Sequence, residues 1–255
     1  MGIVEGKNFL ITGVLTQMSI AYEVARLAQE QGANVVVTGF GRGLSLTKRV
    51  CEKLPKPVEV LELDVTDEEH LSTLASRLSP HVSELDGVLH SIAFAPKEAL
   101  GGNFLNTQWS DVATALQVSA FSLKSLTMAV KPMLSNSASV VGLTFDAKVA
   151  WPIYDWMGVA KAALESTGRY LARDLGEYGV RVNMVAAGPL GSIAAKGIPD
   201  FHRIESIWND RAPLGWDSLD PIPTAKTCIA LMSDWLPKTT GEVIHCDGGV
   251  HAVMG

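Results

Sequence analysis

The fold of this chain is decided by the stretch NFLITG at residues 8–13. A short apolar run that ends at a glycine is typical of a buried strand. From Ser19 onward apolar residues recur at helical spacing, and this pattern stops near Gly32. The chain therefore opens with a strand, a turn that contains one glycine, and an amphipathic helix.

Strands and helices alternate in the same way along the rest of the chain. Further strands are predicted at residues 34–39, 58–63, 86–91, 138–143, 180–186 and 242–246. Helices are predicted after a capping-box sequence at 66–69, over about 109–131, from Tyr154 to about 179, and from near Ile222, whereas 188–220 is less regular. This order indicates an α/β fold, namely a single Rossmann-type domain over residues 1–255 with a doubly wound parallel sheet of seven strands.

Composition narrows the classes of function. The chain has 255 residues, of which 47% are apolar and 19% charged, and this suits a well-cored globular domain. A net charge of −6 argues against nucleic acid or an anionic membrane surface as the main partner. We find no signal peptide and no apolar run long enough to span a bilayer, and the three cysteines have no CxxC spacing. A cytoplasmic location is therefore expected.

No metal site is expected either. Four histidines do not cluster at ligand spacing, and each is interpreted as structural or exposed: His90, His202, His245 and His251.

Tyr154 and Lys161 are the residues that most directly suggest chemistry. They lie seven residues apart at the start of a predicted helix, about 10 Å apart along its axis and on one face. Long side chains lean toward the helix N-terminus, so the ammonium is expected to return toward the phenol. A phenol beside a cation can donate a hydrogen bond to a developing oxyanion. The alternative is an ordinary aromatic residue at a helix start and a solvated lysine.

Ligands of doubly wound sheets bind at the carboxyl ends of the strands. The residues predicted at those ends are Gly13, Phe40, Asp64, Ser91, Phe145 and Gly188. The first turn has one glycine in place of the G-x-G-x-x-G pattern, so alone it fits either a pyrophosphate site or an ordinary turn. Ser19 offers a hydroxyl and a cap at the start of the following helix.

The end of the second strand, residues 38–42, contains no acid for the ribose of NAD. Phe40 can pack against adenine. Arg42 can meet a 2′-phosphate or lie in solvent. Asp64 can accept a hydrogen bond from the adenine amino group, or it can be a helix N-terminal charge.

Together these motifs resemble the enoyl-acyl-carrier-protein reductases of type II fatty acid synthesis, a divergent branch of the short-chain dehydrogenase/reductase superfamily. The mycobacterial type is the most similar. The resemblance covers nearly the whole chain and rests on motifs at residues 19–21, 28–33, 61–65, 90–93, 154–161, 187–190, 211–213 and 231–237.

The resemblance implies that NADH reduces the carbon–carbon double bond of trans-2-enoyl thioesters carried on acyl carrier protein or coenzyme A. It implies catalytic roles for Tyr154, Lys161 and Phe145, with Tyr154 on the thioester carbonyl oxygen and Lys161 on the nicotinamide ribose. The implied cofactor-binding residues are Gly13, Ser19, Ile20, Phe40, Asp64, Val65, Ser91, Ile92, Ala93, Lys161, Gly188, Leu190 and Ser192. The implied substrate-binding residues are Phe94, Tyr154, Met157, Ile198 and Trp208, with a substrate-binding loop around 190–212.

Three departures from the family pattern stand out. Ala93 replaces a glycine, so a methyl group crowds the cofactor slightly. Gly41 replaces an acid of the mycobacterial type, so NADPH is not excluded. The segment 192–208 is shorter than the mycobacterial substrate loop, which suggests acyl chains of ordinary length.

Other functions are weaker alternatives. A carbonyl reductase of the superfamily typically has Tyr-x3-Lys and a serine after the fifth strand, where this chain has Met157 and Phe145. A non-catalytic dinucleotide-binding protein would not need both Tyr154 and Lys161. Reduction of a polyketide-type intermediate stays open. The relatives also imply a homotetramer, and the apolar tail at 250–254 is compatible with one.

Overall fold

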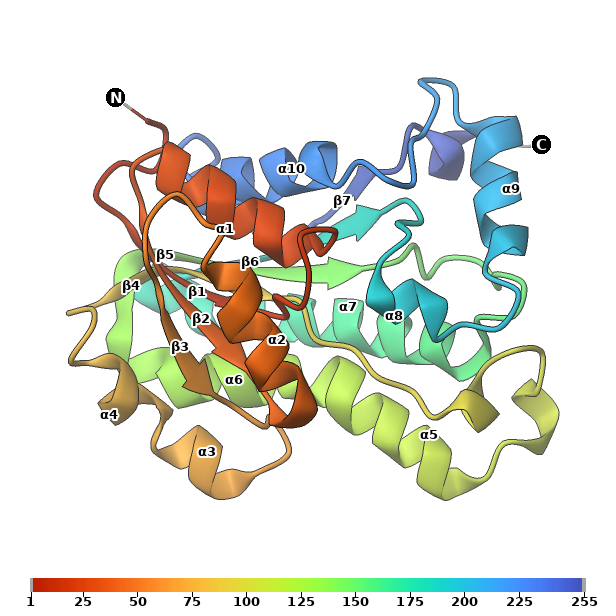
Figure 1. The fold of residues 1–255 in the computed structure, drawn as a ribbon, viewed down its shortest axis with the longest axis horizontal. Helices are drawn as coiled ribbons and strands as arrows, with labels where there is room; N and C mark the ends of the chain where they lie inside the picture. Colours follow the sequence, from red (N-terminus) through yellow and green to blue (C-terminus); the bar gives the residue numbers. More distant parts are fainter. Residues whose placement is uncertain (1, 254–255) are drawn as a thin grey trace.

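The computed structural model describes residues 2–253, so Met254 of the predicted tetramer tail lies outside the described part. It contains one sheet of seven parallel strands in the order β3-β2-β1-β4-β5-β6-β7 (Figure 1). The strands are β1 (Asn8–Thr12), β2 (Asn34–Gly39), β3 (Glu59–Glu62), β4 (Leu85–His90), β5 (Leu134–Thr144), β6 (Arg181–Ala187) and β7 (Val243–Cys246). The predicted Rossmann-type sheet of seven parallel strands is confirmed.

The strand order places a crevice beside β1. The chain runs from β1 outward to β2 and β3, and then crosses to β4 on the other side of β1. Ligands of open parallel sheets bind at this reversal, outside the carboxyl ends of the strands.

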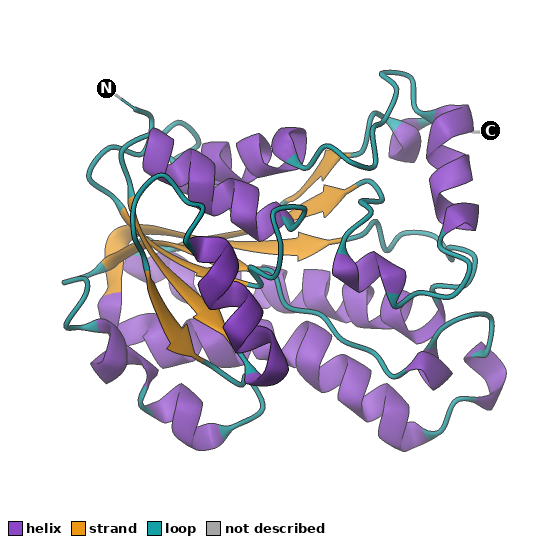
Figure 2. Ribbon diagram, in the orientation of Figure 1, coloured by secondary structure: helices purple, strands orange, loops and turns teal. Residues whose placement is uncertain are grey.

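Helices cover both faces of the sheet (Figure 2). Buried residues of α1, α2 and α10 pack on one face, and those of α4, α6 and α7 pack on the other. The helices are α1 (Ile20–Glu30), α2 (Gly41–Cys51), α3 (Glu68–Ser72), α4 (Leu74–Leu78), α5 (Trp109–Leu116), α6 (Ser122–Val130), α7 (Asp155–Leu175), α8 (Ile193–Lys196), α9 (His202–Arg211) and α10 (Ile222–Met232).

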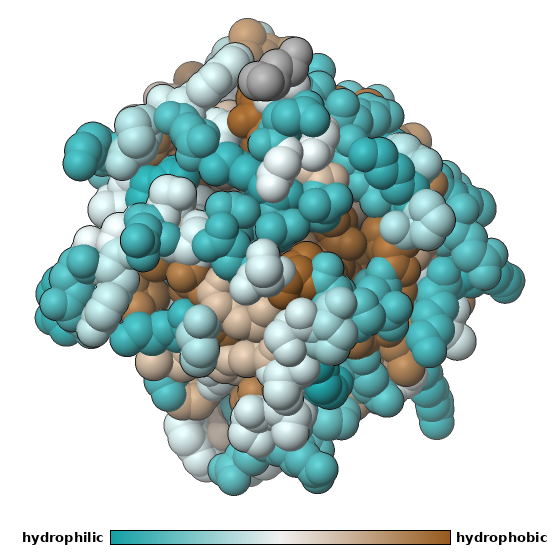
Figure 3. Space-filling model, turned by 90° about the vertical axis from the view of Figure 1, so that its left-hand side faces the viewer, coloured by the Kyte–Doolittle hydropathy of each residue, from teal (hydrophilic) through white to brown (hydrophobic). Residues whose placement is uncertain are grey.

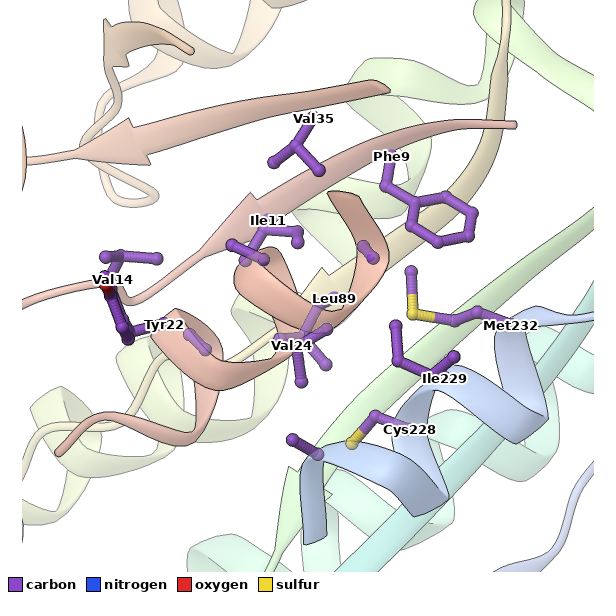
Figure 4. Packing of buried hydrophobic residues seen from close by; sticks show 14 of the residues in the cluster. Phe9, Ile11, Val14, Tyr22, Val24, Val35, Leu89, Cys228, Ile229 and Met232 are labelled. Carbon is purple, nitrogen blue, oxygen red and sulfur yellow. The ribbon is translucent and has the colours of Figure 1, made fainter. Parts of the chain in front are cut away.

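Apolar burial on the first face explains why α1 and α10 lie side by side. Figure 4 shows Phe9 and Ile11 of β1 and Val24 of α1 turned toward Ile229 and Met232 of α10. Each such side chain contributes about 1.5–3 kcal/mol when fully buried. Hydrophilic residues cover much of the surface seen in Figure 3, and apolar residues show between them.

The structure differs from the sequence prediction in several elements. Helix α2 was not predicted, because its first turn contains Gly41 and Gly43, which weaken a helical pattern. The helix predicted after 66–69 is two short helices that break at Thr73, and its cap is Asp67, which accepts the amides of Glu69 and His70. The irregular stretch at 188–220 contains α8 and α9. Strand β5 begins at Leu134, four residues earlier than predicted.

No helix among residues 2–253 combines the length and apolarity that a membrane span requires.

Candidate active site

A cavity of about 800 Å³ opens at the carboxyl ends of the central strands. It runs from the β1–α1 turn, past the ends of β2 and β4, to Lys161 on α7 and the segment after β6. Thirteen of the predicted residues line it: Gly13, Ser19, Ile20, Phe40, Asp64, Val65, Ser91, Ile92, Ala93, Phe94, Lys161, Leu190 and Ser192.

The β1–α1 turn brings the backbone close to the end of β4. Gly13 has φ +83°, and a Cβ there would lie 2.0 Å from the carbonyl oxygen of Ser91. Ser19 occupies the N-cap position of α1, but its hydroxyl does not cap the helix as predicted. It accepts the amides of Leu15 (3.2 Å) and Thr16 (3.0 Å) instead. The first amides of α1 are thereby left to an anion such as a pyrophosphate.

Gly13→Ala tests this close approach. We expect the variant to lose at least about 1 kcal/mol of unfolding free energy from the left-handed backbone alone. The added methyl also collides with Ser91, so NADH binding should weaken strongly. Chemical denaturation and NADH fluorescence titration measure the two effects. Gly6→Ala is a matched control, because Gly6 also has φ +75° but a Cβ there has no neighbour within 4 Å; an equal loss in both variants would contradict the role of the contact.

The far end of the cavity is formed by the ends of β2 and β3. Phe40 is 54% exposed and precedes α2, whose first turn contains no acid. Thr47 of α2 donates to the carbonyl of Val14 at 2.6 Å and ties this end to the first turn. One carboxylate oxygen of Asp64 accepts both the amide (2.8 Å) and the hydroxyl (2.7 Å) of Thr66, which leaves its other oxygen for a ligand.

Lys161 is buried and lines the cavity from α7. Its Nζ donates to the carbonyl oxygen of Leu143 at 2.9 Å. Burial lowers the pKa of Lys161 to about 8, and the nearby Glu165 carboxylate opposes that shift. Glu165 in turn accepts the hydroxyl of Thr144 at 3.1 Å. Burial, with Lys161 nearby, lowers the pKa of His90 to about 3, so His90 is neutral and Lys161 carries the positive charge.

Tyr154 lies beside this cavity in an apolar cluster. Its ring is 5.1 Å from that of Phe145. The same cluster contains the predicted residues Met157, Ile198 and Trp208. Burial raises the pKa of Tyr154, so its phenol stays protonated and able to donate.

The predicted phenol and ammonium lie just before α7 and on its second turn. Helix α7 begins at Asp155, so Tyr154 precedes it, and the Lys161 ammonium is bound to the Leu143 carbonyl. Within residues 2–253 the Tyr154 hydroxyl makes no hydrogen bond, so it is available to a substrate.

Backbone strain surrounds the tyrosine. Ile153 has φ 61° and Asp155 has φ 42°, both unusual for residues other than glycine. The Asp155 carboxylate accepts the amides of Gly102 (2.6 Å) and Asn103 (2.9 Å) and so fixes the turn to the segment after β4. Strained residues of this kind occur often at active sites, where packing holds them in place.

Not every predicted residue lines the cavity. Phe145, Met157, Ile198 and Trp208 belong to the apolar cluster, with Tyr154. Gly188 packs against two tryptophans of this cluster, because a Cβ there would be within 2.7 Å of Trp216 and Trp208.

The sequence reasoning missed Leu143, whose carbonyl anchors the lysine, and Gln117, which lines the cavity from the π-helical turn Gln117–Phe121. A π-helical turn leaves no clear sequence signal, although such turns are frequent at functional sites.

Comparison with known proteins agrees with this geometry. Residues 13–251 match a family described as Enoyl-(Acyl carrier protein) reductase. The chain belongs to this family. A similar relative is the Enoyl-[acyl-carrier-protein] reductase [NADH] of Mycolicibacterium smegmatis, at 48% identity over 97% of each chain. The enzyme of the same name from Mycobacterium avium is 44% identical over 97% of each chain. An Enoyl-[acyl-carrier-protein] reductase [NADPH] from Staphylococcus aureus is 35% identical over 98% of each chain.

The curated relatives of this chain include enzymes named for NADH and enzymes named for NADPH. The residue after β2 and the first turn of α2 contain no acid, the residue type that binds the ribose of NAD at this place in such sheets.

Proposed function

We propose that the chain reduces the carbon–carbon double bond of trans-2-enoyl thioesters with NADH, in the last reductive step of type II fatty acid elongation. The observation that carries the proposal is a dinucleotide-sized cavity that ends at buried Lys161, beside an apolar cluster containing a free phenol. The names of the mycobacterial relatives support both the reaction and the cofactor. The substrate is carried on acyl carrier protein or coenzyme A.

The residues of the cavity fit a dinucleotide. The amides at the start of α1 would hold the pyrophosphate, because a helix N-terminus attracts anions. Phe40 and Asp64 would hold the adenosine half. Lys161 would donate to the nicotinamide ribose, in line with its place at the inner end of the cavity. NADH supplies the hydride when bound.

The apolar cluster would hold the thioester. Reduction at the β-carbon places negative charge on the thioester carbonyl oxygen, and a donor aimed at that oxygen stabilises the transition state. Tyr154 is that donor in our proposal. Phe145 packs against it and separates it from bulk water, which strengthens the hydrogen bond. Phe94, 54% exposed at the cavity edge, would contact the acyl chain.

An assay of nicotinamide absorbance tests the reaction class. NADH oxidation that depends on a trans-2-enoyl thioester is the expected result. Reduction of ketones or aldehydes without enoyl thioester turnover would replace the proposal with a carbonyl reductase.

A series of enoyl thioesters with different acyl chain lengths tests the effect of the shorter substrate loop. Equal preference for very long chains would contradict specificity for chains of ordinary length. Turnover only with enoyl thioesters of polyketide-type intermediates would favour the polyketide-type alternative.

Gly41→Asp tests cofactor choice. Gly41 has φ +51°, which aspartate tolerates better than most residues, and a Cβ there has no neighbour within 4 Å. The added acid can bind the ribose hydroxyls of NADH and repels a 2′-phosphate. We expect the ratio of kcat/KM with NADH to that with NADPH to rise about tenfold, which corresponds to about 1.4 kcal/mol. Gly41→Asn is the matched control, and an equal rise in both variants would exclude charge as the cause.

Two further parts of the proposal concern assembly and location. We propose a homotetramer, because large apolar side chains are exposed on α5 and the segment joining it to α6, including Trp109 (72% exposed) and Phe121 (55%). Analytical ultracentrifugation measures this directly, and a monomer would contradict it. A single catalytic domain, a substrate-binding loop around 190–212 and a cytoplasmic location complete the proposal.

A further inference from the structure

Two histidines outside the cavity form a stacked pair at the end of the sheet. His245 of β7 and His251 of the short helix Val250–Ala252 have ring centroids 3.8 Å apart and planes 16° apart. A carboxylate flanks each ring. The Asp146 oxygen is 3.5 Å from His245 Nε2, and both Asp247 oxygens are 3.0 Å from His251 Nδ1.

The two aspartates also hold the aromatic side chains of the apolar cluster. The indole of Trp151 donates to the backbone carbonyl of Asp146 at 2.6 Å. The indole of Trp208 donates to the backbone carbonyl of Asp247 at 2.9 Å. The histidine pair therefore connects the two chain segments that support these tryptophans.

The tryptophans form a wall around Phe145. Trp151 and Trp208 are 4.9 Å apart, and each ring is 5.3 Å from Phe145. Phe145 in turn packs on Tyr154 at 5.1 Å. We call Phe145, Trp151 and Trp208 the aromatic wall. The position of this wall depends on the hydrogen bonds from Trp151 and Trp208 to the two aspartates, whose carboxylates flank the histidines.

The pair accommodates one proton more easily than two. With one proton, the positive ring lies between carboxylates. With two, like charges face each other at the stacking distance and repel. His245 Nε2 is buried and makes no hydrogen bond within residues 2–253, and the Asp146 oxygen beside it is 3.5 Å away, so a charge there is only partly compensated.

Other charged groups around the pair do not remove this repulsion. Lys148, on the segment after β5, adds positive charge near His245. Glu165 of α7 lies near Asp146. Arg211 of α9 donates to the carbonyl of Val253 in the tail. Burial and His251 lower the pKa of His245, and Asp146 opposes the shift.

We propose that the His245–His251 pair positions the aromatic wall, and that a second proton separates the rings and weakens thioester binding without weakening NADH binding. The proposal rests on the function proposed above, because it assigns the wall to the thioester. His245 and His251 are positioning residues that act through Asp146 and Asp247. Neither is among the residues that line the cavity.

The direction of the pH effect follows from linkage. The native state holds His245 with a pKa below that of the unfolded chain, so between the two values the unfolded or opened state binds more protons. The stacked arrangement is therefore fully favoured above about pH 6.5 and loses stability as the pH falls below that value.

The pH dependence of KM tests the proposal. We expect KM for the enoyl thioester to rise about tenfold between pH 7.5 and 5.5, the effect of one pKa unit, while the Kd for NADH stays constant. His251→Gln cannot form the doubly charged pair, so its KM should not change with pH. His81→Gln, at an exposed site between α4 and β4, is the control and should behave as wild type. A flat wild-type profile, or an equal rise in His251→Gln, would overturn the proposal.

A second measurement does not depend on enzyme activity. Tryptophan emission reports the surroundings of Trp151 and Trp208, and it should shift with pH in the wild type and not in His251→Gln. Comparison with Trp151→Phe assigns the shift to the wall. If no enoyl thioester is turned over but the shift occurs, the proposed reaction fails while the positioning role stands. Emission that does not change with pH would refute the positioning role itself.

Discussion

Tyr154→Phe should lower kcat for enoyl thioester reduction by about 100-fold, the typical cost of removing one oxyanion donor. The Kd for NADH should not change, because the phenol lies in the apolar cluster and not in the lining of the cavity. The variant keeps the ring that packs on Phe145, so its fold should be intact. Steady-state kinetics with saturating NADH measures the effect.

Tyr170→Phe is the matched control for this substitution. Tyr170 lies on α7, the helix that Tyr154 precedes. It is 59% exposed and should be replaceable without loss of activity. A Tyr154→Phe variant with unchanged kcat would move the stabilisation of the carbonyl oxygen to another group, such as a cofactor hydroxyl. A variant that loses kcat and NADH affinity together would instead indicate a structural defect.

Lys161→Met should weaken NADH binding by about 100-fold, because it removes a charge-assisted hydrogen bond worth roughly 1.5–3 kcal/mol in a buried site. The free energy of unfolding should fall by only about 1–3 kcal/mol, because methionine fills the same space but leaves the buried Leu143 carbonyl without its donor. Fluorescence titration of NADH and chemical denaturation separate the two effects. A large loss of stability with normal NADH affinity would contradict a role in binding.

The pH dependence of NADH affinity gives an independent test of the same residue. Burial lowers the pKa of Lys161 to about 8, so the free enzyme loses the ammonium as the pH rises through that value. NADH affinity should therefore be greatest below pH 8 and fall above it. Lys161→Arg keeps its charge at all these pH values and should show no such fall. A wild-type affinity that is constant from pH 7 to 9.5 would exclude this ionisation from binding.

The contrast between α2 and α7 shows which elements the sequence could predict. The long helix after Tyr154 was predicted because small and apolar residues recur at helical spacing over some twenty positions, and the structure has it as Asp155–Leu175. Helix α2 has glycines in its first turn and a mostly polar sequence, and it exists because its Val50 and Cys51 pack on the β1–β2 face. Tertiary packing there overrides a weak local preference.

The active site divides in the same way. The carboxyl ends of parallel strands must meet at one edge, so the sequence alone indicated that Gly13, Asp64 and Ser91 lie close together. Helical spacing alone also placed Lys161 near Tyr154, but it could not show that the ammonium binds the carbonyl of Leu143, eighteen residues earlier. That contact requires β5 and α7 to be packed together.

The sequence by itself therefore determined the layered parallel sheet, the edge at which ligands bind and the chemical groups available there. These features depend on local periodicity and on the order of strands. The tertiary structure alone decided that Tyr154 joins an apolar cluster with Phe145 and Trp208, and that His245 and His251 stack between two aspartates. Such contacts join residues that are distant along the chain, and their geometry depends on how side chains fill space between strands and helices, which no local pattern records.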